Sequence, residues 1–151
     1  METNKEIISD LKDLLSILND GKEGYEAASK GTDTIELQGV FLKYEAQRTA
    51  YAEELRAHIV THGAQATNES GSVLGALHRT WLDITQALSS KEDKAILDAI
   101  VTGEQAALDK YNQYIADYED HADHINLLRK QRDGIQEAME EIETLRSKRN
   151  F

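Results

Sequence analysis

Hydrophobic residues return along this chain at alternating steps of three and four, the spacing that one face of an α-helix produces. The first such segment runs from about residue 4 to 30 and stops at Gly31. The second begins after the capping residues Thr32-Asp33-Thr34 and ends near Gly63. Their inward positions are Ile7, Leu11, Leu14, Leu18, Gly21, Tyr25 and Ala28, then Leu37, Phe41, Tyr44, Arg48, Tyr51, Leu55 and His58. Both segments predict long helices.

Three further segments show the same periodicity. A short one carries Leu74, Leu77, Trp81, Ile84 and Leu88. A long one follows the caps Ser89-Ser90 and carries Leu97, Ile100, Glu104, Ala107, Tyr111, Tyr114 or Ile115, and Tyr118. The last one follows a turn near Glu119-Asp120, carries Ile125, Leu128, Arg132, Ile135, Met139 and Ile142, and ends in basic residues that suit a helix C-terminus.

No stretch alternates with period two, so we expect no strand. Four long helices and one short helix predict an all-α fold, an antiparallel four-helix bundle within a single domain of residues 1–151. Tight connections join the first helix to the second and the fourth to the fifth. The segment from about 64 to 90 is then the crossover, and its short helix lies across one side of the bundle. The absence of proline agrees with unbroken helices.

Charge and composition exclude several classes of function. The chain has 28 Asp and Glu against 17 Lys and Arg, a net charge of −11, so we expect no binding to nucleic acid or to an anionic membrane. It has no cysteine, which excludes thiol nucleophiles, iron–sulfur clusters and cysteine-ligated zinc. Neither a secretory signal nor an apolar run of membrane-spanning length is visible, and we expect a cytoplasmic protein.

Three charged residues interrupt the apolar stripes. Arg48, Glu104 and Arg132 each lie near the middle of their helix. Antiparallel helices of similar length align their midpoints, so these side chains meet in one buried polar layer. An isolated charge there costs several kcal/mol, and we therefore expect Glu104 to pair with Arg48, Arg132 or both. The alternative is that the heptad phase drifts in straight helices and places some of these charges at the bundle edge.

The histidines and carboxylates do not form the usual di-iron pattern of helical bundles. That pattern needs Glu-x-x-His on two helices, and the chain has none; Glu54 and His58 are four residues apart instead of three. His121 and His124 share one helix face, which allows adventitious metal capture, although a solvated helix start is the simpler interpretation. His62 precedes Gly63 at a helix C-terminus, where a cation is favoured. No phosphate-binding loop or nucleophile motif is present, so the sequence favours a non-enzymatic protein.

Several blocks of this sequence resemble a bacterial ferritin-like family that is known only as a domain of unknown function. These blocks are 18–28 (LNDGKEGYEAA), 46–55 (AQRTAYAEEL), 69–84 (ESGSVLGALHRTWLDI), 103–111 (GEQAALDKY) and 142–146 (IETLR). The resemblance implies a ferritin-like bundle with a crossover helix and implies no established reaction. The chain also departs from a family pattern with a histidine near Met139, which weakens a metal assignment.

Three functions remain open from the sequence. The first is a non-enzymatic bundle that acts through protein–protein contacts, including a homodimer through Val40, Ile59 and Val60, or in a stress response. The second is a ferritin-like metalloprotein that binds iron or another divalent metal, for which the ligands are Glu26, Glu54, His78 and Glu104. The third is a small-ligand binder that uses the space under the crossover helix near Trp81 and His78.

Overall fold

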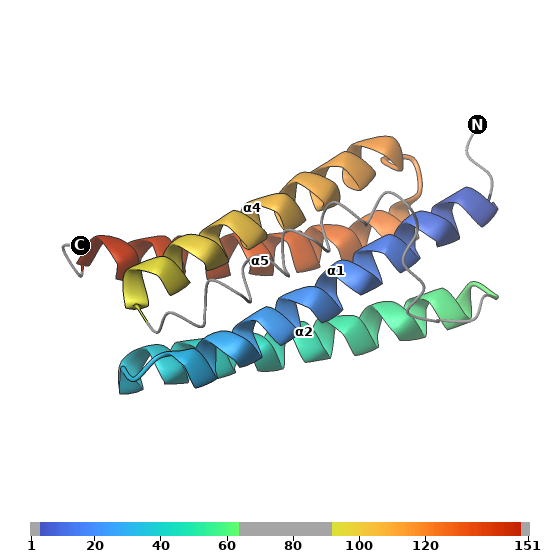
Figure 1. Cartoon of the computed structure of the whole chain (residues 1–151). Helices are drawn as coiled ribbons and strands as arrows, with labels where there is room; N and C mark the ends of the chain where they lie inside the picture. The colour runs from blue at the N-terminus through green and yellow to red at the C-terminus, as the bar shows by residue number, and fades with distance from the viewer. Residues whose placement is uncertain (1–3, 64–91, 149–151) are drawn as a thin grey trace.

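The computed structural model describes residues 4–63 and 92–148, and these ranges form four α-helices and no strand. The helices are α1 (Asn4–Gly31), α2 (Ile35–Thr61), α4 (Asp93–Asp117) and α5 (Ala122–Lys148), as Figure 1 shows. At 1.5 Å per residue each is about 40 Å long. The all-α prediction is confirmed for the described ranges. The predicted crossover at about 64–90, its short helix and His78 lie outside them.

The connection between α1 and α2 is held to the start of α4 by side-chain hydrogen bonds. The hydroxyls of Thr32 and Thr34 both donate to the Asp93 carboxylate, at 2.7 and 2.5 Å. The Thr32 hydroxyl also accepts the backbone N–H of Thr34 at 3.1 Å, close to where α2 begins. Asp93 lies in the first turn of α4, where a negative charge is favoured by the helix dipole. The loop predicted from Gly31 and the threonines thus also fixes this end of the bundle.

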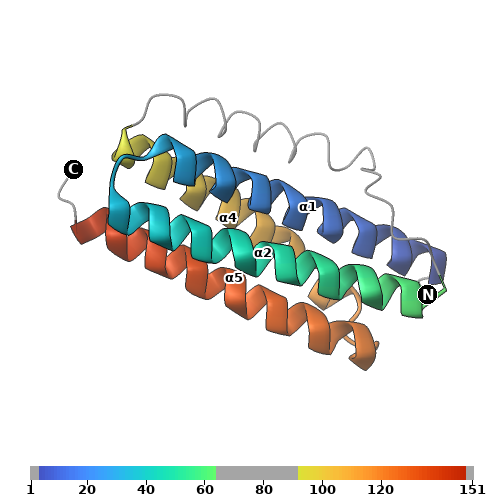
Figure 2. The same ribbon diagram turned by 90° about the horizontal axis from the view of Figure 1, so that it is seen from below.

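Contacts between neighbouring helices show that they run in opposite directions. From one end of α2 to the other, its hydrogen-bonded pairs with α5 are Lys43–Glu141, Glu54–Lys130 and His62–Asp123. Between α1 and α4 they are Asp10–Tyr118, Asp13–Tyr114 and Tyr25–Glu104. Direct packing joins α1 to α2, α4 to α5, α1 to α4 and α2 to α5. Helices α2 and α4 therefore lie across the diagonal of the bundle and run in the same direction (Figures 1 and 2).

The core consists mainly of Leu, Ile and aromatic side chains from all four helices. On α2 the buried residues are Leu37, Phe41, Tyr44, Arg48, Ala52, Leu55 and Ile59. The heptad stripe predicted Tyr51 and His58 where the structure buries Ala52 and Ile59. The reason is that an α-helix advances 3.6 residues per turn, so a strict heptad drifts around it. Because Ile59 is fully buried, it does not serve the homodimer predicted through Val40, Ile59 and Val60.

Polar side chains bridge the seam between α2 and α5 at several levels. Besides the pairs above, the Gln131 side-chain amide donates to the backbone oxygen of Tyr51 and to Glu54, both at 3.1 Å. The Tyr51 hydroxyl lies only 1.9 Å from where a Cβ of residue 134 would be, so Gly134 is what allows the two helices to approach here.

Among the described helices, none has an apolar stretch long enough to cross a membrane.

Candidate functional site

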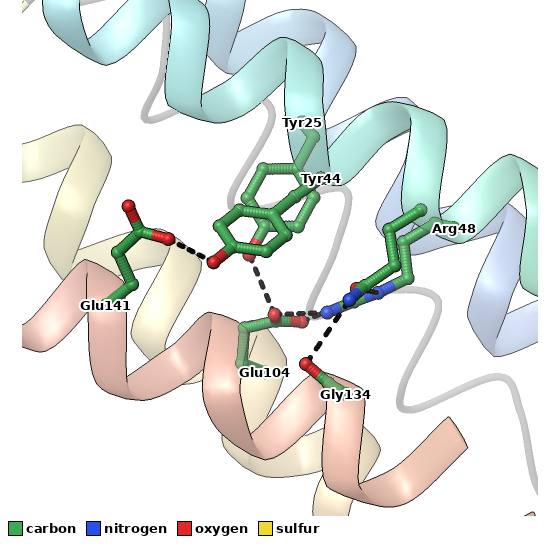
Figure 3. Close-up of polar contacts among 7 residues, drawn as sticks. Tyr25, Tyr44, Arg48, Glu104, Gly134 and Glu141 are labelled. Atoms are coloured by element: carbon green, nitrogen blue, oxygen red, sulfur yellow. Dashed lines mark hydrogen bonds and ion pairs between the residues drawn. The ribbon is translucent and has the colours of Figure 1, made fainter. Parts of the chain in front are cut away.

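A buried ion pair between α2 and α4 occupies the middle of the bundle. The Arg48 guanidinium donates from Nη1 to Glu104 Oε1 at 2.6 Å and from Nη2 to Oε2 at 2.5 Å. The two side chains are 1% and 0% exposed. The Tyr25 hydroxyl of α1 donates to Glu104 Oε2 at 2.7 Å, so three helices contribute to this centre (Figure 3). The paired N–H···O bonds are the geometry in which a guanidinium binds a carboxylate most strongly.

Neighbouring residues complete the surroundings of the guanidinium. Arg48 Nε donates to the side-chain oxygen of Gln47 at 3.1 Å, and Gln47 in turn donates to the backbone oxygen of Gly134 at 3.4 Å. A Cβ at Gly21 would lie 3.1 Å from Arg48 Nη1, so the absence of a side chain there lets the guanidinium lie against α1. The ring of Tyr25 lies 5.4 Å from the guanidinium carbon, a cation–π distance.

The surroundings of this centre keep Tyr25 and Arg48 protonated. Burial raises the pKa of Tyr25 well above its usual value, and the negative Glu104 raises it further. Burial would lower the pKa of Arg48, but the attraction of Glu104 outweighs it and the net shift is upward. Tyr25 therefore stays a hydrogen-bond donor and Arg48 stays charged. Both oxygens of Glu104 accept bonds from these groups, so the carboxylate is neutralised and enclosed within the protein.

Arg132, the third residue predicted for this layer, lies elsewhere. Its side chain is 29% exposed and donates to Asp133 at 2.8 Å and to Asn112 at 2.8 Å. Gln131 takes the inward position on α5 and accepts the Tyr111 hydroxyl at 2.7 Å. The next buried position after Leu128 is three residues later, at Gln131, whereas the predicted heptad stripe placed it four residues later, at Arg132. The expected pairing of Glu104 with Arg48, Arg132 or both is thus realised with Arg48.

The carboxylates predicted as metal ligands lie in separate surroundings. Glu26 is on the surface of α1 and pairs with Lys30 at 3.0 Å. Glu54 pairs with Lys130 at 2.5 Å and accepts from Gln131, while Glu104 is held by Arg48. Over residues 4–63 and 92–148, no group of three ligand atoms includes any of these glutamates. The cations that neutralise them are protein side chains.

Three histidines converge where α2 ends and α5 begins, and sequence reasoning did not bring them together. One ring nitrogen each from His58, His62 and His124 lies within 4.8 Å of the others. His58 Nε2 and His124 Nδ1 are 2.8 Å apart. His62 Nδ1 is 2.8 Å from the backbone oxygen of His58, and its Nε2 is 2.9 Å from Asp123 Oδ2. The signal available in the sequence was the spacing of four between His58 and His62.

Burial and charge act differently on the three imidazoles. Burial lowers the pKa of His58 and of His124 below the usual value, and the neighbouring imidazoles lower the pKa of His58 further. The pKa of His62 is raised, because its ring donates to the backbone oxygen of His58 and faces the Asp123 carboxylate. Asp123 in turn has a lowered pKa because of its hydrogen bond with His62. Besides the centre around Glu104, this histidine cluster is a second group of interacting polar side chains within residues 4–63 and 92–148.

Comparison with known proteins gives one family. The family model described as Domain of unknown function (DUF2383) matches residues 6–117 of the chain. No curated protein and no solved structure matches the chain.

Proposed function

The chain belongs to the DUF2383 family, a domain of unknown function, and from its geometry we propose that it is a non-enzymatic helical bundle that acts through protein–protein contacts. The observation that carries this proposal is an apolar strip on the outer side of α2. Ile35, Leu42 and Val60 are 83%, 53% and 56% exposed, although such side chains are usually covered. At 3.6 residues per turn, these positions fall within about 20° of one another around the helix.

A second copy of the same chain is the partner that suits this strip. Gly39, Ala46 and Ala57 lie on the same side of α2 and are exposed. No atom lies within 4 Å of where a Cβ of Gly39 would be. Small side chains between larger apolar ones let two helices approach closely, and a two-fold axis brings the same strip of both copies together. The strip carries one charged residue, Glu53.

The chemistry of the interior favours this function over an iron centre at the middle of the bundle. A di-iron site needs several carboxylates that face one another without competing cations. Here the carboxylate at the middle of the bundle, that of Glu104, already binds the guanidinium of Arg48 through both oxygens. The third possibility, a small ligand near Trp81 and His78, concerns residues outside the described ranges.

The arrangement of the helices supports a ferritin-like connectivity within this proposal. Because α2 and α4 run in the same direction, the chain between them has to pass from one end of the bundle to the other. A crossover at about 64–90 provides this passage. A place in the bacterial cytoplasm, with which the lack of cysteine is compatible, and a role in stress are part of the same proposal.

Light scattering coupled to size exclusion tests the self-association. The monomer mass is 17.0 kDa, and we expect the wild type to elute as a dimer of twice that mass. Leu42→Glu places a charge in the apolar strip and is expected to return the protein to the monomer. Asn126→Glu adds the same charge on the exposed side of α5 and is the matched control, which stays dimeric. A wild type that is monomeric at high concentration contradicts the proposal.

A further inference from the structure

We propose that His58, His62 and His124 form a binding site for one divalent transition-metal ion of the zinc class. The site lies where α2 ends and α5 begins, and it is independent of the strip on α2. Its ligand atoms already lie within 4.8 Å of one another. A tetrahedral zinc ion with bonds of about 2.0–2.1 Å separates its ligand nitrogens by roughly 3.3 Å. Small rotations of the imidazoles therefore bring all three nitrogens onto one ion.

The surroundings of His62 call for a cation at its Nε2. Its Nδ1 lies 2.8 Å from the backbone oxygen of His58, an acceptor, so Nδ1 carries the proton. In the neutral ring Nε2 then holds a lone pair, and this lone pair faces the carboxylate of Asp123 at 2.9 Å. Two acceptors at that distance repel unless a positive charge lies between them. Either a proton or a metal ion provides that charge.

His58 and His124 also offer facing nitrogens between which a metal ion can bind. Their facing nitrogens are 2.8 Å apart, which places one hydrogen-bonding proton between them. A metal ion takes the place of this proton when the rings separate by about 0.5 Å, to the spacing of zinc ligands. The ring that donated this proton then carries it on its outer nitrogen instead, so that His58 has its N–H on Nδ1 and His124 has its N–H on Nε2, the neutral forms that coordinate metals.

The donor set indicates the class of ion and a fourth ligand. Three imidazole nitrogens suit Zn²⁺, Co²⁺, Ni²⁺ and Cu²⁺, whereas Mg²⁺ and Ca²⁺ prefer oxygen ligands. Asp123 lies in the first turn of α5 and contacts His62, but its carboxylate lies outside the group of three, so it closes a tetrahedral site only after its side chain turns toward the ion. The same order of affinities places Fe²⁺ below Co²⁺ at such a site.

An ion in this site joins the two halves of the bundle. His58 and His62 belong to the hairpin of α1 and α2, and His124 to the hairpin of α4 and α5. These hairpins pack against each other through α1 and α4, and they also meet along the α2–α5 seam, where direct packing is sparser. A ligand that binds the folded state alone stabilises it by mass action. Zn²⁺ at about 100 times its dissociation constant is therefore expected to raise the thermal midpoint by roughly 5–10 °C.

The test is titration of Zn²⁺ and Co²⁺ into chelator-treated protein that carries no affinity tag. We expect about one ion per chain by calorimetry and the visible absorption of four-coordinate Co²⁺. His58→Gln and His124→Gln each remove a ligand, and we expect them to weaken binding by about 100-fold or more. His62→Gln replaces a ligand that is less buried than His124. It provides the test of ligand loss if the His124 variant does not fold.

His121→Gln is the matched control. His121 is also at this end of the bundle, with its ring centre 6.0 Å from that of His124, but it is outside the group of three. We expect it to retain the stoichiometry, the affinity and the Co²⁺ spectrum of the wild type. Equal weakening by His121→Gln and His124→Gln, or a stoichiometry far below one ion per chain, would overturn the site. Neither result bears on self-association through α2, which is measured separately.

Discussion

Replacement of Arg48 by methionine is expected to lower the free energy of unfolding by about 3–5 kcal/mol, because it leaves the Glu104 carboxylate buried without a cation. The guanidinium provides two charge-assisted hydrogen bonds, and both partners are almost completely buried. Methionine fills much of the space but cannot compensate the charge. Urea denaturation followed by far-ultraviolet circular dichroism measures the loss. Arg129→Met, at an exposed position on α5, is the matched control and should leave the free energy of unfolding unchanged.

Removal of the whole polar centre provides the second part of this test. A triple variant with Arg48→Met, Glu104→Leu and Tyr25→Phe leaves neither a charge nor an unpaired hydroxyl at this centre. Buried ionic groups replaced together by apolar ones of similar size often cost nothing, so we expect the triple variant to recover most of the lost stability. If Arg48→Met alone does not fold, the stability of the triple variant still tests the prediction. An Arg48→Met variant that loses less than about 1 kcal/mol, or a triple variant no more stable than it, contradicts this account.

The centre itself was accessible to sequence reasoning, for an identifiable reason. Arg48 and Glu104 each interrupt a run of apolar residues at the middle of a long helix, and a charge in that position needs a partner. The alignment of midpoints in antiparallel helices then brings the two side chains to one level. Tyr25 belongs to the predicted stripe of α1, but its hydrogen bond to Glu104 depends on its rotamer, which the periodicity does not determine.

The helix phase sets the limit of this reasoning. On α5 the stripe allows either a step of three or a step of four after Leu128, and the two choices bury Gln131 or Arg132. The structure buries the amide, whose oxygen accepts the Tyr111 hydroxyl and whose nitrogen donates to Tyr51 and Glu54. Such a choice depends on partners supplied by other helices. It is not contained in the pattern of one segment.

The histidine cluster was missed because it depends on how two distant helices are rotated. His58 and His62 are one turn apart and can be grouped from the sequence, but His124 lies 62 residues beyond His62. Heptad periodicity placed His58 inside the bundle. The observed rotation of α2 buries Ile59 instead and turns His58 and His62 toward the start of α5. That relative rotation is a property of the packed bundle.

Replacement of Tyr25 by phenylalanine is expected to lower the free energy of unfolding by about 1.5–3 kcal/mol, the usual range for a buried hydrogen bond to a charged group. The ring still packs against Phe41 and Tyr44, so the substitution removes only the hydroxyl that donates to Glu104. No water replaces that donor in a centre that is fully buried.

Tyr44→Phe is the matched control for this hydroxyl deletion. Tyr44 donates to Glu141 (Figure 3). That carboxylate is about one-third exposed and also pairs with Lys43. Water and the lysine can therefore satisfy Glu141 after the substitution, and we expect a loss below about 1 kcal/mol. Urea denaturation of the two variants under the same conditions makes the comparison. Equal losses from Tyr25→Phe and Tyr44→Phe would show that the buried carboxylate does not depend on its third hydrogen bond, and the centre would then reduce to the ion pair of Arg48 and Glu104 alone.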